Sequence, residues 1–140
     1  MFSLFTLLGL SFDETNMTIE VGQLLEDSLL KVWSERNDEL RLKTMQQIYA
    51  TDIVFYETDT SPAIIGHQAI DSLIKKLQKQ WPLDFVFTLK KPVVTNHSIS
   101  HVSWVLGVAK ATPAASGMDI AIIESGLIKE LYLYLDDPTD

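Results

Sequence analysis

Two carboxylic acids stand in segments that are otherwise apolar, and they are the residues best suited to chemistry. Glu57 ends the run IVFYE, and Asp119 precedes the apolar residues of MDIAIIES. If neighbouring side chains bury these carboxyl groups, the loss of hydration favours their neutral, protonated form. Two acids that differ in proton affinity can then divide the roles of acid and base in a proton-transfer reaction.

Each acid also has a purely structural interpretation. Glu57 precedes the turn sequence TDTSP, and a hydrated glutamate is ordinary at the end of a strand. Asp119 follows Ser116 and Gly117, and its carboxylate can accept hydrogen bonds from the backbone of that turn. The residues alone leave both interpretations open for each acid.

The histidines add one possibility. His101 and Trp104 share a strand-like segment but lie on opposite faces of it, because three positions separate them. Only one of the two can face a cavity, and a hydrolytic Asp–His pair would need His101 there. We expect His67 and His97 to be solvated.

Composition excludes several classes of function. The chain has no cysteine, so disulfides, thiol catalysis and thiolate metal sites are absent. Its histidines lack metal-ligand spacing, and it has neither a glycine-rich phosphate loop nor a G-x-S-x-G motif. A net charge of −8 would repel polyanions, so we expect neither nucleic acid nor membrane as a partner. We expect no metal and no cofactor.

Helical periodicity dominates the first half of the chain. Apolar residues recur at helical spacing over residues 18–33. A second helix should begin with Asp38 as its N-cap and include Tyr49 among its apolar positions. A third should follow Gly66 and end before Pro82, which cannot continue a helix.

The second half of the chain is strand-like. Five runs are rich in β-branched and aromatic residues: DFVFTLKK, PVVT, SISHVSWVLGVAK, MDIAIIES and LIKELYLYLD. Helices followed by consecutive strands predict an α+β domain with a meandering antiparallel sheet. In the last run Leu131 and Leu133 alternate with Tyr132 and Tyr134, so both faces are apolar or amphipathic. We expect one face to cover the helices and the other to form a homodimer, unless the chain itself buries both.

A chain of 140 residues is expected to form one domain. Residues 1–16 are an apolar extension that is too short to span a bilayer and lacks the features of a signal peptide. This extension either packs on the domain or lies upstream of a natural start at Met17. We expect residues 17–137 to form the domain and the protein to be cytoplasmic.

The order of these segments resembles the nuclear transport factor 2-like superfamily, especially its SnoaL-like and ketosteroid isomerase-like members. The resemblance covers roughly residues 18–136 and rests on an opening helix with a late Trp, on IYATD followed by VFYE, on GHQAI, and on DIAIIESGLIKEL. It implies a curved antiparallel sheet wrapped as a cone around about three N-terminal helices, with an apolar pocket at the open end. Members include isomerases, epoxide hydrolases, dehydratases, polyketide cyclases and non-catalytic adaptors, so the fold does not fix the function.

The resemblance also implies roles for single residues. Glu57, eight residues after Tyr49, matches the general base of ketosteroid isomerases, which is usually Asp. Asp119 matches the carboxylic acid of their oxyanion hole. Trp33 stands where those enzymes have a Tyr, and an indole N–H is a weaker donor than a phenol, so we do not expect steroid isomerisation itself.

The same resemblance places Trp104 and Val102 inside the cone and His101 on the other face. We expect the pocket walls to include Trp33, Tyr49, Phe55, Val102, Trp104 and Leu131. The expected function is the binding of a small, mostly apolar molecule, with Glu57 and Asp119 as catalytic residues if the protein is a cofactor-free isomerase, cyclase or hydrolase. A non-catalytic small-molecule-binding or dimerisation module is the alternative.

Overall fold

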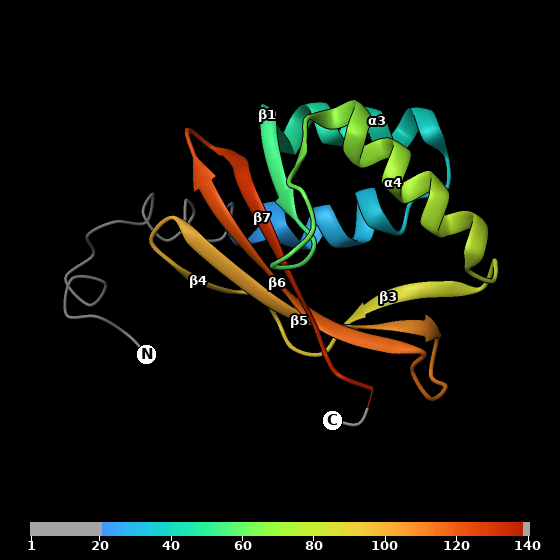
Figure 1. Ribbon diagram of the computed structural model, residues 1–140. Coiled ribbons are helices and arrows are strands. Elements are labelled where there is room, and N and C mark those ends of the chain that lie inside the picture. Colours follow the sequence, from blue (N-terminus) through green and yellow to red (C-terminus); the bar gives the residue numbers. More distant parts are fainter. Residues whose placement is uncertain (1–20, 139–140) are drawn as a thin grey trace, which may run out of the picture.

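The protein is built from an open, curved sheet with helices packed on one of its faces, as the computed structural model describes for residues 21–138 (Figure 1). The strands are β1 (Tyr49–Tyr56), β2 (Ile64–Ile65), β3 (Phe85–Leu89), β4 (Val94–Asn96), β5 (Ile99–Val108), β6 (Ala115–Glu124) and β7 (Leu127–Leu135). Their order is β2-β1-β7-β6-β5-β3, and β4 also pairs with β5. The predicted α+β class, with a curved sheet around N-terminal helices, is confirmed.

One strand pair departs from the antiparallel pattern. β1 and β7 run parallel, whereas all other pairs of the sheet are antiparallel. A tight hairpin forces antiparallel pairing, but about half of the chain separates β1 from β7, so these two strands are free of that constraint. A tight hairpin joins β6 and β7, with Ser125 and Gly126 both at positive φ.

The helices lie near where the periodicity predicts them, but Tyr49, predicted to belong to the second helix, is the first residue of β1 because its backbone is already extended there. Residues 21–33 are helical and end in a π-helix, η1 (Ser28–Trp33); α3 (Asp38–Ile48) and α4 (His67–Gln80) follow. The predicted N-cap of α3 is wrong by one residue. Asn37, not Asp38, is the cap, because its side-chain oxygen accepts a hydrogen bond from the N–H of Leu40 at 3.0 Å.

Strand registers decide which side chains face the helices. In β6 the residues Asp119 and Ala121 are buried, whereas Ile120 is half-buried and lies opposite Tyr132 of β7 and His101 of β5. Residues directly opposite one another in an antiparallel pair share a face of the sheet. We call the face with Asp119 the inner face and the face with Ile120 the outer face.

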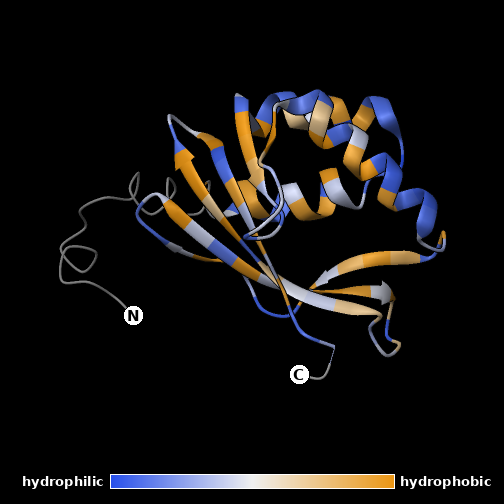
Figure 2. Cartoon of the chain, in the orientation of Figure 1, coloured by the Kyte–Doolittle hydropathy of each residue, from blue (hydrophilic) through white to orange (hydrophobic). Residues whose placement is uncertain are grey.

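Apolar side chains of the helices and of the inner face form the core, and Figure 2 shows hydrophobic segments on both layers. The fully buried residues include Leu25, Leu29, Val32, Met45, Ile70 and Ile74 from the helices, and Ile53, Val102, Ala121, Ile128 and Leu131 from the sheet. Burial of each large apolar side chain contributes about 1.5–3 kcal/mol. Within residues 21–138, no helix combines the length and apolar character that a membrane crossing requires. The predicted extension, residues 1–16, lies outside the described residues.

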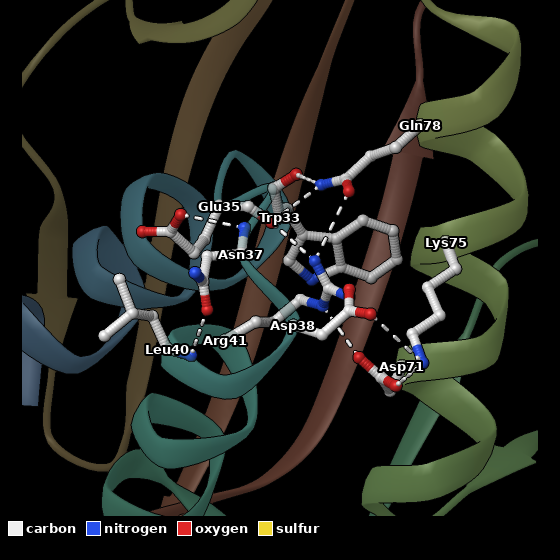
Figure 3. A network of polar contacts seen from close by, with 9 residues as sticks. All are labelled: Trp33, Glu35, Asn37, Asp38, Leu40, Arg41, Asp71, Lys75 and Gln78. Atoms are coloured by element: carbon white, nitrogen blue, oxygen red, sulfur yellow. Dashed lines mark hydrogen bonds and ion pairs between the residues drawn. The ribbon is translucent and has the colours of Figure 1, made fainter.

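A buried guanidinium connects the helices (Figure 3). Arg41 of α3 has no exposed surface, and its Nε donates to Oδ1 of Asp71 in α4 at 2.7 Å. Its Nη1 donates to the backbone oxygen of Glu35 at 2.6 Å, and its Nη2 donates to Oδ1 of Asp38 at 2.5 Å. A buried charge is tolerated when it is paired and hydrogen-bonded, and Arg41 meets that condition.

Gln78 of α4 extends this network to the end of the first helix. Its Nε2 donates to the backbone oxygens of Trp33 and Glu35, at 3.2 and 2.9 Å, and its Oε1 accepts from Arg41 at 3.3 Å (Figure 3). The last carbonyl groups of a helix have no partner within it, so Gln78 satisfies the carbonyl of Trp33, while the carbonyl of Glu35 also accepts from Arg41. The network therefore fixes the backbone at Trp33.

We expect Arg41→Ala to lower the free energy of unfolding by about 3 kcal/mol, because the buried carboxylate of Asp71 then keeps only the partly exposed Lys75 as its ion-pair partner. Urea unfolding followed by circular dichroism measures this loss. Asp38→Asn is the matched control: Asp38 is exposed, so solvent screens its ion pair with Arg41 and its loss should change the free energy of unfolding far less. Equal losses in the two variants would contradict this account of the network.

Candidate functional site

A cavity of about 240 Å³ lies between the helices and the inner face of the sheet. Its walls are mostly apolar, and its lining residues are Leu29, Trp33, Phe55, Glu57, Leu77, Trp81, Phe87, Trp104, Leu106, Ala115, Asp119, Leu133 and Leu135. These residues come from η1, from α4 and its C-terminal end, and from five strands or strand ends. Leu135 is exposed and Glu57 is half-buried, so this side of the cavity meets solvent.

Asp119 is the buried polar group of the cavity. Its residue is 6% exposed, and its Oδ1 accepts a hydrogen bond from Nε1 of Trp104 at 3.0 Å. Its Oδ2 has no hydrogen-bond partner within residues 21–138. Within residues 21–138, the indole nitrogen of Trp33 is the only fully enclosed side-chain N or O atom that lacks a hydrogen-bond partner. Oδ2 of Asp119 also lacks a partner, so it cannot be fully enclosed and must border open space. Asp119 therefore presents one free oxygen to the cavity.

Burial changes the proton affinity of Asp119. Desolvation raises its pKa from 3.8 to about 7, while the hydrogen bond from Trp104 acts in the opposite direction by stabilising the carboxylate. Near neutral pH this group therefore exists in both forms. A carboxyl group of this kind can donate a proton or a hydrogen bond at a pH where an ordinary aspartate cannot.

Gly117 allows Trp104 to reach this carboxylate. Trp104 pairs with Gly117 across β5 and β6, and Asp119 lies two residues further along the same face. A Cβ atom at position 117 would lie 2.8 Å from Cζ2 of Trp104 and 2.8 Å from the backbone oxygen of Tyr134. The absence of a side chain at Gly117 thus makes room for the indole ring across β6.

Glu57 follows the last residue of β1 and lines the same cavity as Asp119. Its side chain is half-buried and forms no ion pair or hydrogen bond with other residues of the 21–138 region. An acid without a partner beside a cavity is free to interact with whatever enters. The structure therefore brings both predicted acids to one cavity.

Trp33 lines the cavity, and Tyr49 lies in the core outside the lining. The ring of Trp33 lines the cavity and packs against Phe55 with ring centroids 5.1 Å apart. Behind it, the hydroxyl groups of Tyr49 and Ser28 are 2.5 Å apart, and both residues are buried. Burial raises the pKa of Tyr49 strongly, although its contacts with Ser28 and Trp33 act in the opposite direction, so Tyr49 stays a neutral phenol.

The sequence-predicted residues separate into two groups. Glu57, Asp119, Trp33, Phe55 and Trp104 line the cavity. Tyr49, Val102 and Leu131 are buried in the core and are not part of the lining. Ligand contact by these three residues stays a prediction.

Several lining residues were missed by sequence reasoning. Leu133 and Leu135 had a usable signal, because they alternate with Tyr132 and Tyr134 in β7. Trp81, immediately before Pro82, had no local signal that separates a cavity wall from ordinary core. Within the described part of the chain, no group of three or more His, Cys, Asp or Glu residues could hold a metal ion.

Known proteins resemble this chain in structure but not in recognisable sequence. A scan against protein-family models and a search of curated proteins find no match. Among solved structures, a proposed isomerase of the SnoaL-like family from Agrobacterium tumefaciens matches with a TM-score of 0.71 and 20% identity over 87% of this chain and 99% of that chain. The chain has the SnoaL-like, nuclear transport factor 2-like fold. The predicted resemblance is thus confirmed at the level of the fold.

Two further neighbours extend this result. A proposed ketosteroid isomerase from Kribbella flavida matches with a TM-score of 0.63 and 17% identity, over 88% of this chain and 82% of that chain. A proposed SnoaL-like polyketide cyclase from Jannaschia sp. CCS1 matches with a TM-score of 0.69 and 8% identity, over 86% of this chain and 88% of that chain. Sequences this distant share the SnoaL-like fold, whereas the function of each depends on its own cavity.

Asp119 should make the stability of this domain depend on pH. Because folding raises its pKa, the folded state holds this proton more tightly than the unfolded state. The stabilisation is complete below about pH 4 and is lost as the pH rises through about 7. Between pH 4 and pH 8, we expect the free energy of unfolding of wild type to fall by at most about 4 kcal/mol relative to that of Asp119→Asn.

Urea unfolding of both proteins at several pH values measures this difference. Asp84→Asn, which removes one exposed carboxylate, is the control and should follow the wild-type profile. Parallel profiles for wild type and Asp119→Asn would show that the buried carboxyl group does not titrate as described.

Proposed function

We propose that this protein binds a small, mostly apolar molecule in the cavity and transfers a proton on it with its own carboxyl groups. The observation that carries the proposal is the position of Asp119. Its carboxyl group is buried in an apolar cavity, with Oδ1 held by Trp104 and Oδ2 free, and Glu57 lines the same cavity. Few structural roles explain a buried acid with one oxygen left unpaired.

The two acids suit opposite steps of one reaction. In its protonated form Asp119 donates a hydrogen bond from Oδ2 to a carbonyl oxygen of the bound molecule. Glu57 removes a proton from the carbon next to that carbonyl, the C–H electrons form a carbon–carbon double bond, and negative charge develops on the oxygen near Asp119. If the bound molecule has a carbon–carbon double bond next to the deprotonated carbon, return of the proton to the far end of that double bond moves the double bond into conjugation with the carbonyl and completes an isomerisation.

The surroundings favour this chemistry. Apolar walls keep water from competing for the developing charge, which strengthens its interaction with the hydrogen-bond donor. Structural neighbours described as proposed isomerases or as a proposed polyketide cyclase lend support to this class of reaction.

Exchange of the α-hydrogens of cyclohexanone in deuterated water, followed by NMR, tests the proposal. We expect wild type to accelerate the exchange, and Glu57→Gln to reduce the acceleration by at least about 100-fold, because a general base contributes roughly 10²–10⁴ in rate. Asp119→Asn should also lose rate, and the wild-type acceleration should fall above about pH 7, where Asp119 loses its proton. Asp84→Asn serves as the control for one lost charge.

Calorimetry with cyclohexanone separates the proposed enzyme from its alternative. Binding without any acceleration of exchange would favour a non-catalytic small-molecule-binding module. Equal exchange rates in wild type and Glu57→Gln would remove Glu57 from the reaction.

For the outer face of the sheet we propose a homodimer contact. Ile120 and Tyr132 are half-buried at its centre, and Tyr134 and Ile99 are 57% and 46% exposed. Tyr132 also stacks on Tyr56 of β1, with ring centroids 4.6 Å apart. Several exposed or half-exposed apolar and aromatic side chains on one face of a sheet favour a protein–protein contact there.

Light scattering after size-exclusion chromatography tests the dimer. We expect wild type to elute with twice the monomer mass and Ile120→Lys to elute as a monomer, because the substitution places a charge at the centre of the contact. Leu83→Lys, at a residue that is 85% exposed and lies outside the sheet, should remain dimeric. A wild-type protein of monomer mass at micromolar concentration would refute the contact.

A further inference from the structure

The charges that face the cavity have one sign. Glu57 and Asp119 are the ionisable residues of its lining, and no Lys, Arg or His of the described chain belongs to that lining. The whole chain is also acidic, with a net charge of −8. Low-dielectric walls concentrate the field of such charges, so an anionic ligand would be repelled and a cationic one attracted.

The aromatic walls fit a cation as well. The lining contains Trp33, Phe55, Trp81, Phe87 and Trp104. Phe87 stands nearly perpendicular to both Trp104 and Trp81, at 82° and 78°, so the rings present their faces in more than one direction. The faces of aromatic rings attract cations that lie within about 6 Å of the ring centre.

The position of the free acceptors limits the kind of cation. Oδ1 of Asp119 already accepts from Trp104, which leaves Oδ2 as the one free oxygen of this carboxyl group beside the cavity. The other acid of the lining, Glu57, is half-buried and lies on the side of the cavity that meets solvent. A primary ammonium group has three N–H donors, and those without partners would be desolvated at a cost in an apolar cavity. A tertiary ammonium group has one N–H donor, and its alkyl groups can contact the aromatic rings.

We propose that the cavity binds a small tertiary amine in its protonated form, with its N–H donated to Oδ2 of Asp119 and its alkyl groups against the aromatic walls. The proposal rests on the binding part of the proposed function and not on turnover. Toward a carbonyl compound Asp119 acts as a neutral acid, whereas toward an amine it acts as a carboxylate. A nearby cation favours that ionised form, which opposes the effect of burial on its pKa.

Three probes with similar carbon skeletons but different charges test which ligand charge the cavity prefers. They are N,N-dimethyl-2-phenylethylamine, its neutral carbon counterpart isopentylbenzene, and the anion 3-phenylpropanoate. All three tryptophans of the chain line the cavity, so intrinsic tryptophan fluorescence reports binding there directly. We expect wild type at pH 7 to bind the amine at least about tenfold more tightly than 3-phenylpropanoate.

The variants identify the contact. Asp119→Asn should weaken amine binding by about tenfold or more and leave the dissociation constant of isopentylbenzene within about twofold, since hydrogen bonds to charged groups are the stronger ones. Asp84→Asn removes the same charge from an exposed site and should alter neither affinity.

Two outcomes would overturn the proposal. The first is wild-type protein that binds the anion as tightly as the amine, a comparison that needs no variant. The second is an amine affinity that is equal in wild type and Asp119→Asn. Amine binding without cyclohexanone exchange would refute the proposed enzyme and leave this inference standing, whereas exchange without selectivity for the amine would do the reverse.

Discussion

The buried ion pair between Arg41 and Asp71 is the contact on which the arrangement of the helices depends. Arg41 has no exposed surface, and its guanidinium reaches α4, the start of α3 and the backbone beyond the first helix. A planar, permanently charged group with several donors can serve partners in different directions at once. Gln78 belongs to the same network and donates a hydrogen bond to the backbone oxygen of Trp33. Polar contacts outside the cavity therefore fix the position of Trp33, which is one of the cavity walls. The helices are thereby held in a defined position above the inner face, where the cavity lies.

The chemistry of the cavity follows from its position between these two layers. Alternation along β6 places Asp119 on the inner face, where it loses hydration, and the diagonal neighbour Trp104 satisfies one of its oxygens. Gly117 provides the room that this contact needs. The second oxygen has no partner, so the same carboxyl group can offer a proton or a negative charge to a ligand. Its partner acid, Glu57, reaches the cavity from the other half of the sheet because β1 lies beside β7.

Much of the fold could be predicted from the sequence, since the helices and strands carry strong periodic patterns. The residues Leu25, Leu29 and Val32 recur at helical spacing and are all buried. The central position of Arg41 could not be predicted, because its acceptors come from three separate segments. The cavity lining was only partly predictable for a similar reason. Tyr49 lies on the correct side of β1, yet its hydroxyl turns to Ser28 in the core, a choice that depends on packing between elements.

The parallel pairing of β1 with β7 affects how the protein can form during synthesis. Within the sheet β1 contacts only β2 and β7, and its partners in β7 include Leu131 and Tyr132, close to the C-terminus. The ribosome synthesises β1 long before β7, so β1 cannot pair with β7 until the later strand has been made. Contacts between residues so distant in the chain slow folding, because a large loop must close before they form. Until the last strand emerges, the hydrophobic side chains of β1 have only the helices and the short strand β2 for protection.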